Sequence, residues 1–397
     1  MSARDEIEER LALLTDQSGS VAPISAGERA ARRERLAGLL ASAGFDALLC
    51  EPGATLSWLT GVGWGISERL FAAVFLAGGS HFWLAPAFEE RRARLALEGS
   101  EGPGGELVTW DEDEYAFAPL AAALRARRVE RLCVEPAVRY GFVERLAREL
   151  GRPPAPAAHD LVLALRGRKD GHELALLRRA NELTQRALAL TGELVRPGMT
   201  GAEIGAIARR AQERLGLADV WEIALIGPAA AFPHGSDERV ELARGSVVLL
   251  DTGGALHGYQ SDNTRTWVFD AEPQPDVARA WHAVRDAQRA AFDAIRPGVR
   301  CRAVDAAARA VIDAAGFGTG YRAFTHRLGH GIGLEGHEAP FLDGGSDVEL
   351  APGMTFSDEP GIYLPGRFGL RIEDVVAVTA DGAEHFGSWQ AGPRAPA

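Results

Sequence analysis

An internal repeat in the second half of the sequence constrains the fold more than any other feature. Its first copy has a long helical pattern, the tripeptide Arg196-Pro197-Gly198, a second helical pattern that stops at Gly216, and a histidine-bearing loop. The same order returns around Arg296-Pro297-Gly298, and its second helical pattern stops at Gly316. Proline and glycine end helices, because proline lacks an amide donor and glycine tolerates left-handed backbone. The repeat predicts a pseudo-twofold domain with its functional site between two αα-ββ halves.

Each half also carries two acidic residues on a predicted strand pair. In the first half, the apolar run SVVLLDTGG predicts a strand that ends at Asp251, where we expect the chain to turn. The returning strand of GYQSDNTRTWVF carries Asp262, which we expect to oppose Asp251 across the hairpin. A single Asp at such a place is usually a turn former, but two carboxylates among apolar residues repel each other unless a cation or protons compensate them. The second half repeats the pattern with Glu359 and Glu373.

Three histidines, His326, His330 and His337, lie in the glycine-rich segment HRLGHGIGLEGHE. Glycines permit a close approach between the backbone and a ligand. The spacing is not HExxH, which excludes the helical zinc-protease motif. Oxygen ligands outnumber nitrogen ligands and no cysteine takes part, so the residues favour a two-metal centre with bridging carboxylates that holds manganese or a similar ion.

Composition narrows the classes of partner and compartment. The net charge of −12 argues against nucleic acid, whose binding proteins present a basic face. Cys50, Cys133 and Cys301 are far apart and form no CxxC motif, which fits a reducing cytosol. The acidic start MSARDEIEER is unlike a signal peptide, and no apolar run approaches the roughly 18 residues that span a membrane. We therefore expect a cytoplasmic protein with no membrane partner.

The domain organisation follows from shifts in composition. Residues 1–24 are expected to form an N-terminal arm, and residues 25–160 an α/β domain in which strand-like and helical runs alternate. The Pro- and Ala-rich segment GRPPAPAAHD at 151–160 predicts a linker, after which residues 161–397 form the repeat-containing domain. In the first domain, Arg69 in the turn-rich segment GVGWGISER is a candidate for function rather than packing.

The segments DTGGALHGYQSDNTRT, AFPHG, HRLGHGIGLEGHE, EPGIYLPG and GLRIED together resemble the pita-bread metallopeptidases, in the Xaa-Pro aminopeptidase and prolidase branch. The resemblance covers residues from about 160 to 385, with the motifs in the family's order and spacing. The TGVGWG segment and its α/β surroundings are similar to the family's smaller creatinase-like domain. The resemblance implies an α+β fold with a creatinase-like N-terminal domain, a pita-bread catalytic domain, and assembly as a homodimer.

The resemblance also implies a set of metal ligands. These would hold two divalent ions, most readily Mn²⁺ with Co²⁺ and Zn²⁺ as alternatives, and they are Asp251, Asp262, His330, Glu359 and Glu373. Asp262 and Glu373 would bridge both ions, and a water or hydroxide between the ions would be the nucleophile. Glu359 would also act as the general base.

Further residues take roles by the same resemblance. His234 and His337 would bind substrate and stabilise the tetrahedral intermediate, or move a proton to the leaving proline nitrogen. Arg371 would orient ligands or substrate. Tyr363 would bind substrate, and His326 matches a family position without a defined role.

Asp358, beside the expected ligand Glu359, departs from the family pattern, in which this position is usually apolar or threonine. Strand alternation predicts that its side chain points away from the metals.

The expected reaction is hydrolysis of the bond between an N-terminal residue and proline in Xaa-Pro dipeptides. Arg69 could bind the dipeptide carboxylate and so exclude longer chains, which favours a dipeptidase. The alternative is an Xaa-Pro aminopeptidase that acts on longer peptides. A metal-free creatinase-like hydrolase and a non-catalytic peptide-binding module are more remote, because the full ligand set is present.

Overall fold

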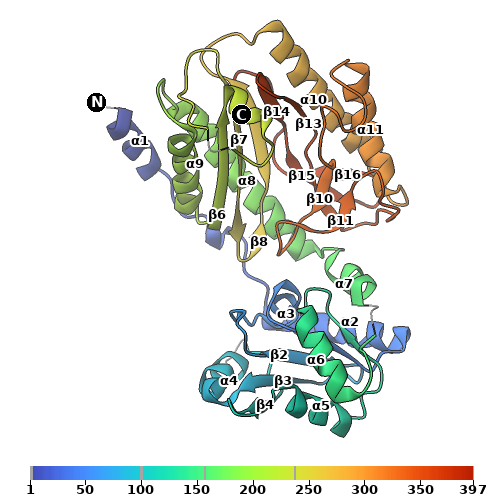
Figure 1. Ribbon diagram of the computed structural model, residues 1–397. Coiled ribbons are helices and arrows are strands. Elements are labelled where there is room, and N and C mark those ends of the chain that lie inside the picture. The colour runs from blue at the N-terminus through green and yellow to red at the C-terminus, as the bar shows by residue number, and fades with distance from the viewer. Residues whose placement is uncertain (1–2, 99–101, 156–157, 237, 397) are drawn as a thin grey trace. The chain divides into compact units, whose positions relative to one another are not determined.

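The computed structural model describes residues 3–98, 102–155, 158–236 and 238–396, which form two compact units (Figure 1). One unit is Ile24–Arg166, and the other combines Met1–Pro23 with Gly167–Ala397. The predicted linker at 151–160 lies partly outside the described residues, at 156 and 157, and its last three residues belong instead to the helix α7, Ala158–Arg166.

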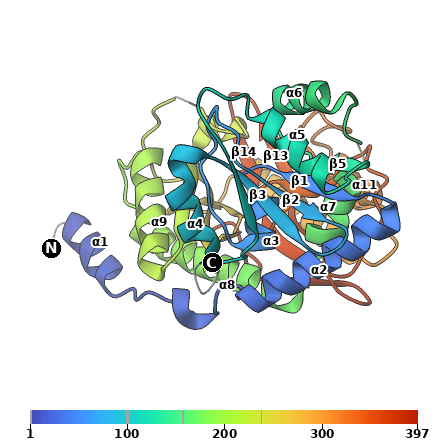
Figure 2. The same ribbon diagram turned by 90° about the horizontal axis from the view of Figure 1, so that it is seen from below.

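The smaller unit is built on a five-stranded mixed sheet in the order β4-β3-β2-β1-β5. Its strands are β1 Ala47–Cys50, β2 Ala72–Leu76, β3 His81–Pro86, β4 Glu106–Trp110 and β5 Leu132–Val134. Its other helices are α2 Ala26–Ala43, α3 Ala54–Thr60, α4 Glu90–Glu98, α5 Phe117–Ala126 and α6 Tyr140–Leu150, with a short 3-10 turn at Ala87–Glu89. Figure 2 shows α5 and α6 on one face of this sheet and α2 on the other. The predicted alternation of strands and helices is confirmed.

The larger unit contains the repeat. Its helices are α1 Ala3–Ala12, α8 Gly171–Leu194, α9 Gly201–Leu215, α10 Pro275–Ala294 and α11 Cys301–Ala314, with 3-10 turns at Ser18–Ser20 and Gly227–Ala231. The strands of the first half are β6 Ala218–Ile226, β7 Val247–Leu256, β8 Tyr259–Gln260 and β9 Asn263–Val268. The strands of the second half are β10 Gly329–Gly331, β11 Glu338–Leu342, β12 Thr355–Asp358, β13 Gly361–Leu364, β14 Phe368–Arg371, β15 Asp374–Val378 and β16 Ala383–His385. Both ribbon views place α9 and α11 at opposite sides of this unit.

The two Arg-Pro-Gly turns have nearly the same geometry. Gly198 and Gly298 both adopt left-handed backbone, with φ of 86° and 84°. The amide of Gly198 donates to the carbonyl of Leu242 at 2.7 Å, and the amide of Gly298 donates to the carbonyl of Leu350 at 2.8 Å. Each turn therefore ends a helix and attaches to the segment that leads into the acidic strands of its own half, which confirms the predicted repeat.

Helices pack against the sheets of both halves. In the first half β6, β7 and β8 are neighbours in that order and β9 also pairs with β7, while the second half has the order β11-β10-β12-β15-β16 beside the β13-β14 hairpin. The largest core cluster joins α10 and α11 to the second half, with Trp281, Val284 and Ile312 almost completely buried. This core supports β12 and β14, which end shortly before Glu359 and Glu373, and β15, which begins directly after Glu373.

The hairpin of the first half differs from its prediction. Strand β7 runs to Leu256, so Asp251 lies in the middle of the strand and not at its end. Its partner across the pair is Thr264, and Asp262 lies just before β9 begins. The prediction that Asp251 and Asp262 oppose each other was wrong, because Gly253 and Gly254 continue the strand instead of turning it.

Candidate metal centre

A cavity of about 460 Å³ in the larger unit collects most of the predicted site residues. It is lined by Trp221, Ile223, Pro233, His234, Asp251, Asp262, His326, Arg327, His330, His337, Glu359, Arg371 and Glu373. All five expected metal ligands are among them, although they come from segments more than a hundred residues apart. The acidic residues of both halves thus face one space.

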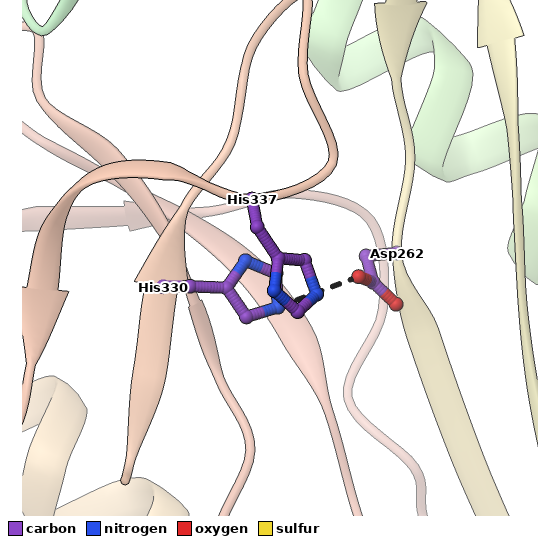
Figure 3. A group of neighbouring side chains, drawn as sticks. All are labelled: Asp262, His330 and His337. Atoms are coloured by element: carbon purple, nitrogen blue, oxygen red, sulfur yellow. Dashed lines mark ion pairs between the residues drawn. The ribbon is translucent and has the colours of Figure 1, made fainter. Parts of the chain in front are cut away.

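Ligand atoms within this cavity fall into three overlapping groups, each with atoms no more than 4.8 Å apart. The groups are Asp251 with Asp262 and Glu373, His330 with Glu359 and Glu373, and Asp262 with His330 and His337. Figure 3 shows the third group, in which two imidazoles from one segment approach the carboxylate of Asp262. Asp262 and Glu373 each belong to two groups, so each has an atom within reach of two ligand positions.

The ring of His330 is oriented by its neighbours. Its Nδ1 lies 3.2 Å from the carbonyl oxygen of Gly331, and because a carbonyl only accepts, Nδ1 carries the hydrogen. Nε2 therefore presents a lone pair, 3.4 Å from Glu359 Oε1 and 3.6 Å from Asp262 Oδ2. Burial, together with the nearby His337, lowers the pKa of His330 to about 3, so the ring is neutral. Three acceptor atoms that face one another repel unless a cation lies among them.

The carboxylates need the same compensation. Burial raises the pKa of Asp262 well above its usual range, and the charge of Asp251 raises it further. Burial raises the pKa of Glu373 in the same way, with Asp262 as the next cause, and raises that of Glu359 to about 7. Among the described residues, nothing donates to Asp262 Oδ1. Oxygen-rich, negatively charged and with one neutral imidazole, this donor set fits a pair of divalent metal ions.

Arg371 and Thr264 hold the carboxylates in place. The guanidinium of Arg371 forms a buried ion pair with Asp251 and donates from Nε to the Thr264 hydroxyl at 3.0 Å. The Thr264 hydroxyl in turn lies 2.8 Å from Asp251 Oδ1 and 2.6 Å from Glu373 Oε2. Thr264 was not identified from the sequence; it lies on β9, where it pairs with Asp251 on β7.

A second chain of hydrogen bonds joins two residues of the cavity lining, His326 and Arg371, through Tyr363. His326 Nδ1 is 2.7 Å from the carbonyl of Arg327, so Nε2 accepts the Tyr363 hydroxyl at 2.8 Å. The Tyr363 oxygen accepts from Arg371 at 2.9 Å, and burial raises the pKa of Tyr363 to about 12. Arg371 also donates to the carbonyl of Pro233 at 3.2 Å, next to His234. Arg371 therefore joins Asp251, an expected metal ligand, to the segment that carries His234.

Other contributors were also missed in the sequence. Ser357 accepts from the backbone amide of His330 and donates to Glu359 Oε1, both at 3.0 Å. Trp221 and Ile223 line one side of the cavity from β6. No motif marks these residues, because a serine or tryptophan on a strand is common in sheets that have no function.

Arg69, Tyr363 and Asp358 are not among the residues that line the cavity. Arg69 belongs to the smaller unit, where it pairs with Glu112 through Nε at 2.9 Å and stacks over Phe88. Its role in binding a substrate carboxylate stays a prediction. Asp358 is fully buried opposite Asp374 on β15, and burial and that neighbour raise its pKa. It belongs to none of the ligand groups found among the described residues.

The crowding of acids predicts how the metal-free protein responds to pH. Because Asp262, Glu359 and Glu373 have folded pKa values above those of the unfolded chain, the folded state holds protons that the unfolded state has released. Stability must then fall as pH rises through the folded values, by roughly 1–4 kcal/mol between pH 6.5 and 8. His330, with a lowered pKa, acts in the opposite direction but only below about pH 6.5, where unfolded histidine takes up protons.

Urea denaturation in the presence of a chelator, at both pH values, measures this loss. Adding back divalent metal should shrink it, because the ions compensate the carboxylates. Equal stability of the metal-free protein at the two pH values would contradict the expectation.

Comparison with family models matches the chain in two parts. Residues 175–380 match metallopeptidase family M24, and residues 32–167 match the creatinase/prolidase N-terminal domain. The matched regions coincide with the larger and smaller units, and the predicted pairing of a pita-bread domain with a creatinase-like domain is confirmed.

Individual relatives agree with this result. A probable dipeptidase PepE of Mycobacterium bovis is 40% identical over 356 residues, which cover 89% of this chain and 93% of that protein. An Xaa-Pro dipeptidase of Lactobacillus delbrueckii subsp. lactis is 31% identical, covering 89% of this chain and 95% of the relative. The crystal structure of dipeptidase PepE from Mycobacterium ulcerans superposes with a TM-score of 0.87 at 35% identity, over 94% of this chain and 99% of that one.

Proposed function

Because the chain belongs to metallopeptidase family M24, we propose that it hydrolyses the bond between an N-terminal residue and proline in Xaa-Pro dipeptides. The enzyme is a peptidase whose family implies divalent metal ions. One observation carries the proposal: five buried or nearly buried ligand residues from both halves converge in one cavity, where they fall into overlapping groups. The apolar side of the cavity, with Trp221 and Pro233, suits a proline ring.

The two ions would be held by Asp251, Asp262, His330, Glu359 and Glu373, with Asp262 and Glu373 shared between them. When bound, such ions lower the pKa of a water molecule and polarise the scissile carbonyl. Manganese is the metal we favour, since oxygen donors dominate; cobalt and zinc are alternatives.

The protein's own groups then handle protons and charge. Glu359 takes the proton of the attacking water, and the Ser357 hydroxyl at 3.0 Å orients its Oε1. His337 lies at the cavity, and partial burial together with the charge of Arg327 lowers its pKa, so a neutral ring there donates a hydrogen bond to the developing oxyanion. His234 faces the same cavity and assists the leaving proline nitrogen. Arg371 holds Asp251 in position, and Tyr363 holds Arg371 in turn.

The direct test is hydrolysis of Gly-Pro by protein stripped with a chelator and then supplied with manganese. We expect activity to disappear on chelation and to return with the metal. Activity that survives chelation would overturn the proposal and would favour a metal-free hydrolase, whereas no activity in either state would favour a non-catalytic peptide-binding module.

The same assay separates a dipeptidase from the alternative, an Xaa-Pro aminopeptidase. Xaa-Pro dipeptides should be cleaved faster than Xaa-Pro-Yaa tripeptides. An Arg69→Ala variant tests the proposed carboxylate contact, and it should cleave dipeptides more slowly without losing activity on tripeptides. Unchanged dipeptide kinetics in that variant would remove Arg69 from the substrate-binding residues.

We further propose that the enzyme works in the cytoplasm as a homodimer. All three cysteines are free and buried, which suits a reducing compartment. No helix in the described part of the chain has the length and apolarity needed to cross a membrane. The net charge of −12 argues against nucleic acid as a partner.

A further inference from the structure

The start of α8 carries a buried charge that the proposed mechanism does not use. Lys169 immediately precedes Asp170, the N-cap of that helix. Its Nζ lies 2.6 Å from Glu338 Oε1, and the two side chains are only 1% and 8% exposed. Glu338 directly follows His337 in the chain. A buried lysine therefore binds the residue next to a proposed participant in the chemistry.

The turn that carries His337 is built closely around this ion pair. A side chain at Gly333 would meet Glu338 Oε1 at 2.7 Å and Lys169 Cε at 3.0 Å, so the backbone of the turn lies directly on the pair. Gly331 and Glu338 are neighbours across β10 and β11. Lys169 itself is fixed by its backbone amide, which donates to the carbonyl of Gly353 at 2.7 Å. A hydrogen bond thus fixes the backbone of Lys169, and the ion pair attaches the turn to the ammonium group of this residue.

A second contact ties the same turn to the first half of the repeat. The carbonyl of Gly333 accepts from the amide of Gln260 at 2.8 Å, two residues before Asp262. Next to Gln260, the Tyr259 hydroxyl donates to Glu173 Oε1 at 2.8 Å, and Glu173 lies in the first turn of α8. The beginning of α8 therefore holds both the strand leading to Asp262 and the turn leading to His337.

Among the described residues, no hydrogen bond or ion pair holds the His337 ring. The residue is exposed, and its ring stacks on that of His330 with centroids 3.7 Å apart. A buried ion pair is weak evidence for stability, because well-packed apolar side chains often stabilise as much. The ion pair instead gives the turn a defined position. This position matters for His337, because an error of about 1 Å in the place of a catalytic group can cost roughly 100-fold in rate.

We propose that Lys169 is a positioning residue for His337, acting through Glu338. The proposal rests on the proposed function, in which His337 donates to the oxyanion. Lys169→Met should lower kcat for Gly-Pro by about 10- to 100-fold and change KM by less than about threefold. Metal content should equal that of the wild type, since Lys169 is not in any ligand group. Arg168→Met, which removes an exposed cation from the adjacent position, should leave kcat unchanged.

A double-mutant cycle separates positioning from a general structural role. If Lys169 acts through His337, Lys169→Met combined with His337→Ala should be no slower than His337→Ala alone, within about twofold. Losses that multiply, or a loss of bound metal in Lys169→Met, would overturn the proposal. Should Lys169→Met fail to fold because the buried Glu338 loses its ion pair with Lys169, Lys169→Met with Glu338→Gln removes the carboxylate charge and should show the same loss in kcat.

Hydrogen exchange of the metal-free protein gives a readout that does not need activity. Amides of residues 331–338 should exchange faster in Lys169→Met than in the wild type or in Arg168→Met. Unchanged exchange in this segment would overturn the positioning proposal. Absence of Gly-Pro hydrolysis by the wild type would instead overturn the proposed function, so the two failures are distinguishable.

Discussion

Asp262→Asn is expected to lower kcat/KM for Xaa-Pro hydrolysis by at least about 1000-fold. Asp262 supplies atoms to two of the three ligand groups, so the change weakens both ion positions at once. The isosteric amide removes one negative charge and one ligand oxygen while it preserves the volume. Metal bound per chain, measured by mass spectrometry alongside kcat/KM, should fall with activity.

In the metal-free protein, we expect the same substitution to preserve or raise the stability of the fold. Burial and the charge of Asp251 already oppose ionisation of Asp262, so its removal relieves repulsion in the absence of metal. The metal-free variant should be at least as stable as the metal-free wild type to urea at pH 8. Asp270→Asn, at an exposed position after β9 where positive φ also suits Asn, is the matched control and should change neither quantity.

An Asp262→Asn variant that keeps its full metal content and activity would contradict the assignment of Asp262 as a shared ligand. A variant that keeps its metal but loses activity would indicate that Asp262 orients the attacking water or the substrate and is not needed to bind the ions.

Arg371→Met is expected to lower kcat/KM by roughly 100-fold or more and to destabilise the metal-bound protein by about 3–5 kcal/mol. The guanidinium forms a fully buried ion pair with Asp251 and donates to Thr264 and Tyr363. Methionine keeps much of the volume but leaves these acceptors without their donor. Steady-state kinetics and urea denaturation with saturating manganese measure the two losses.

Arg371→Lys keeps the charge but not the planar fork that reaches several partners, so it should recover part of the stability and less of the activity. Arg367→Met, on the turn between β13 and β14, removes an exposed arginine paired with Asp276 and should cost less than about 1 kcal/mol. If Arg371→Met were as stable and active as Arg367→Met, the buried network would not be what holds Asp251.

Local features of the fold were predictable because they depend on a few adjacent residues. The capping box of Thr200 and Glu203 begins α9, and the left-handed Gly216 ends it, where the second helical pattern was predicted to stop. The long helical pattern predicted before Arg196-Pro197-Gly198 is α8. The predicted end of β7 was wrong: the glycines after Asp251 suggested a turn, whereas pairing with β6 and β8 continues the strand to Leu256.

The sequence by itself determined which residue types are available for the metal centre and in which half of the repeat each one lies. The ligand types, the helix ends and the Arg-Pro-Gly repeat each depend on a few adjacent residues, because backbone preferences and side-chain identity act locally. Only the tertiary structure decided which atoms meet. The contact of Thr264 with Asp251 and Glu373, and that of Lys169 with Glu338, join residues up to 169 positions apart. Such contacts depend on strand register and on burial of charge between distant segments, and no short stretch of sequence encodes either one.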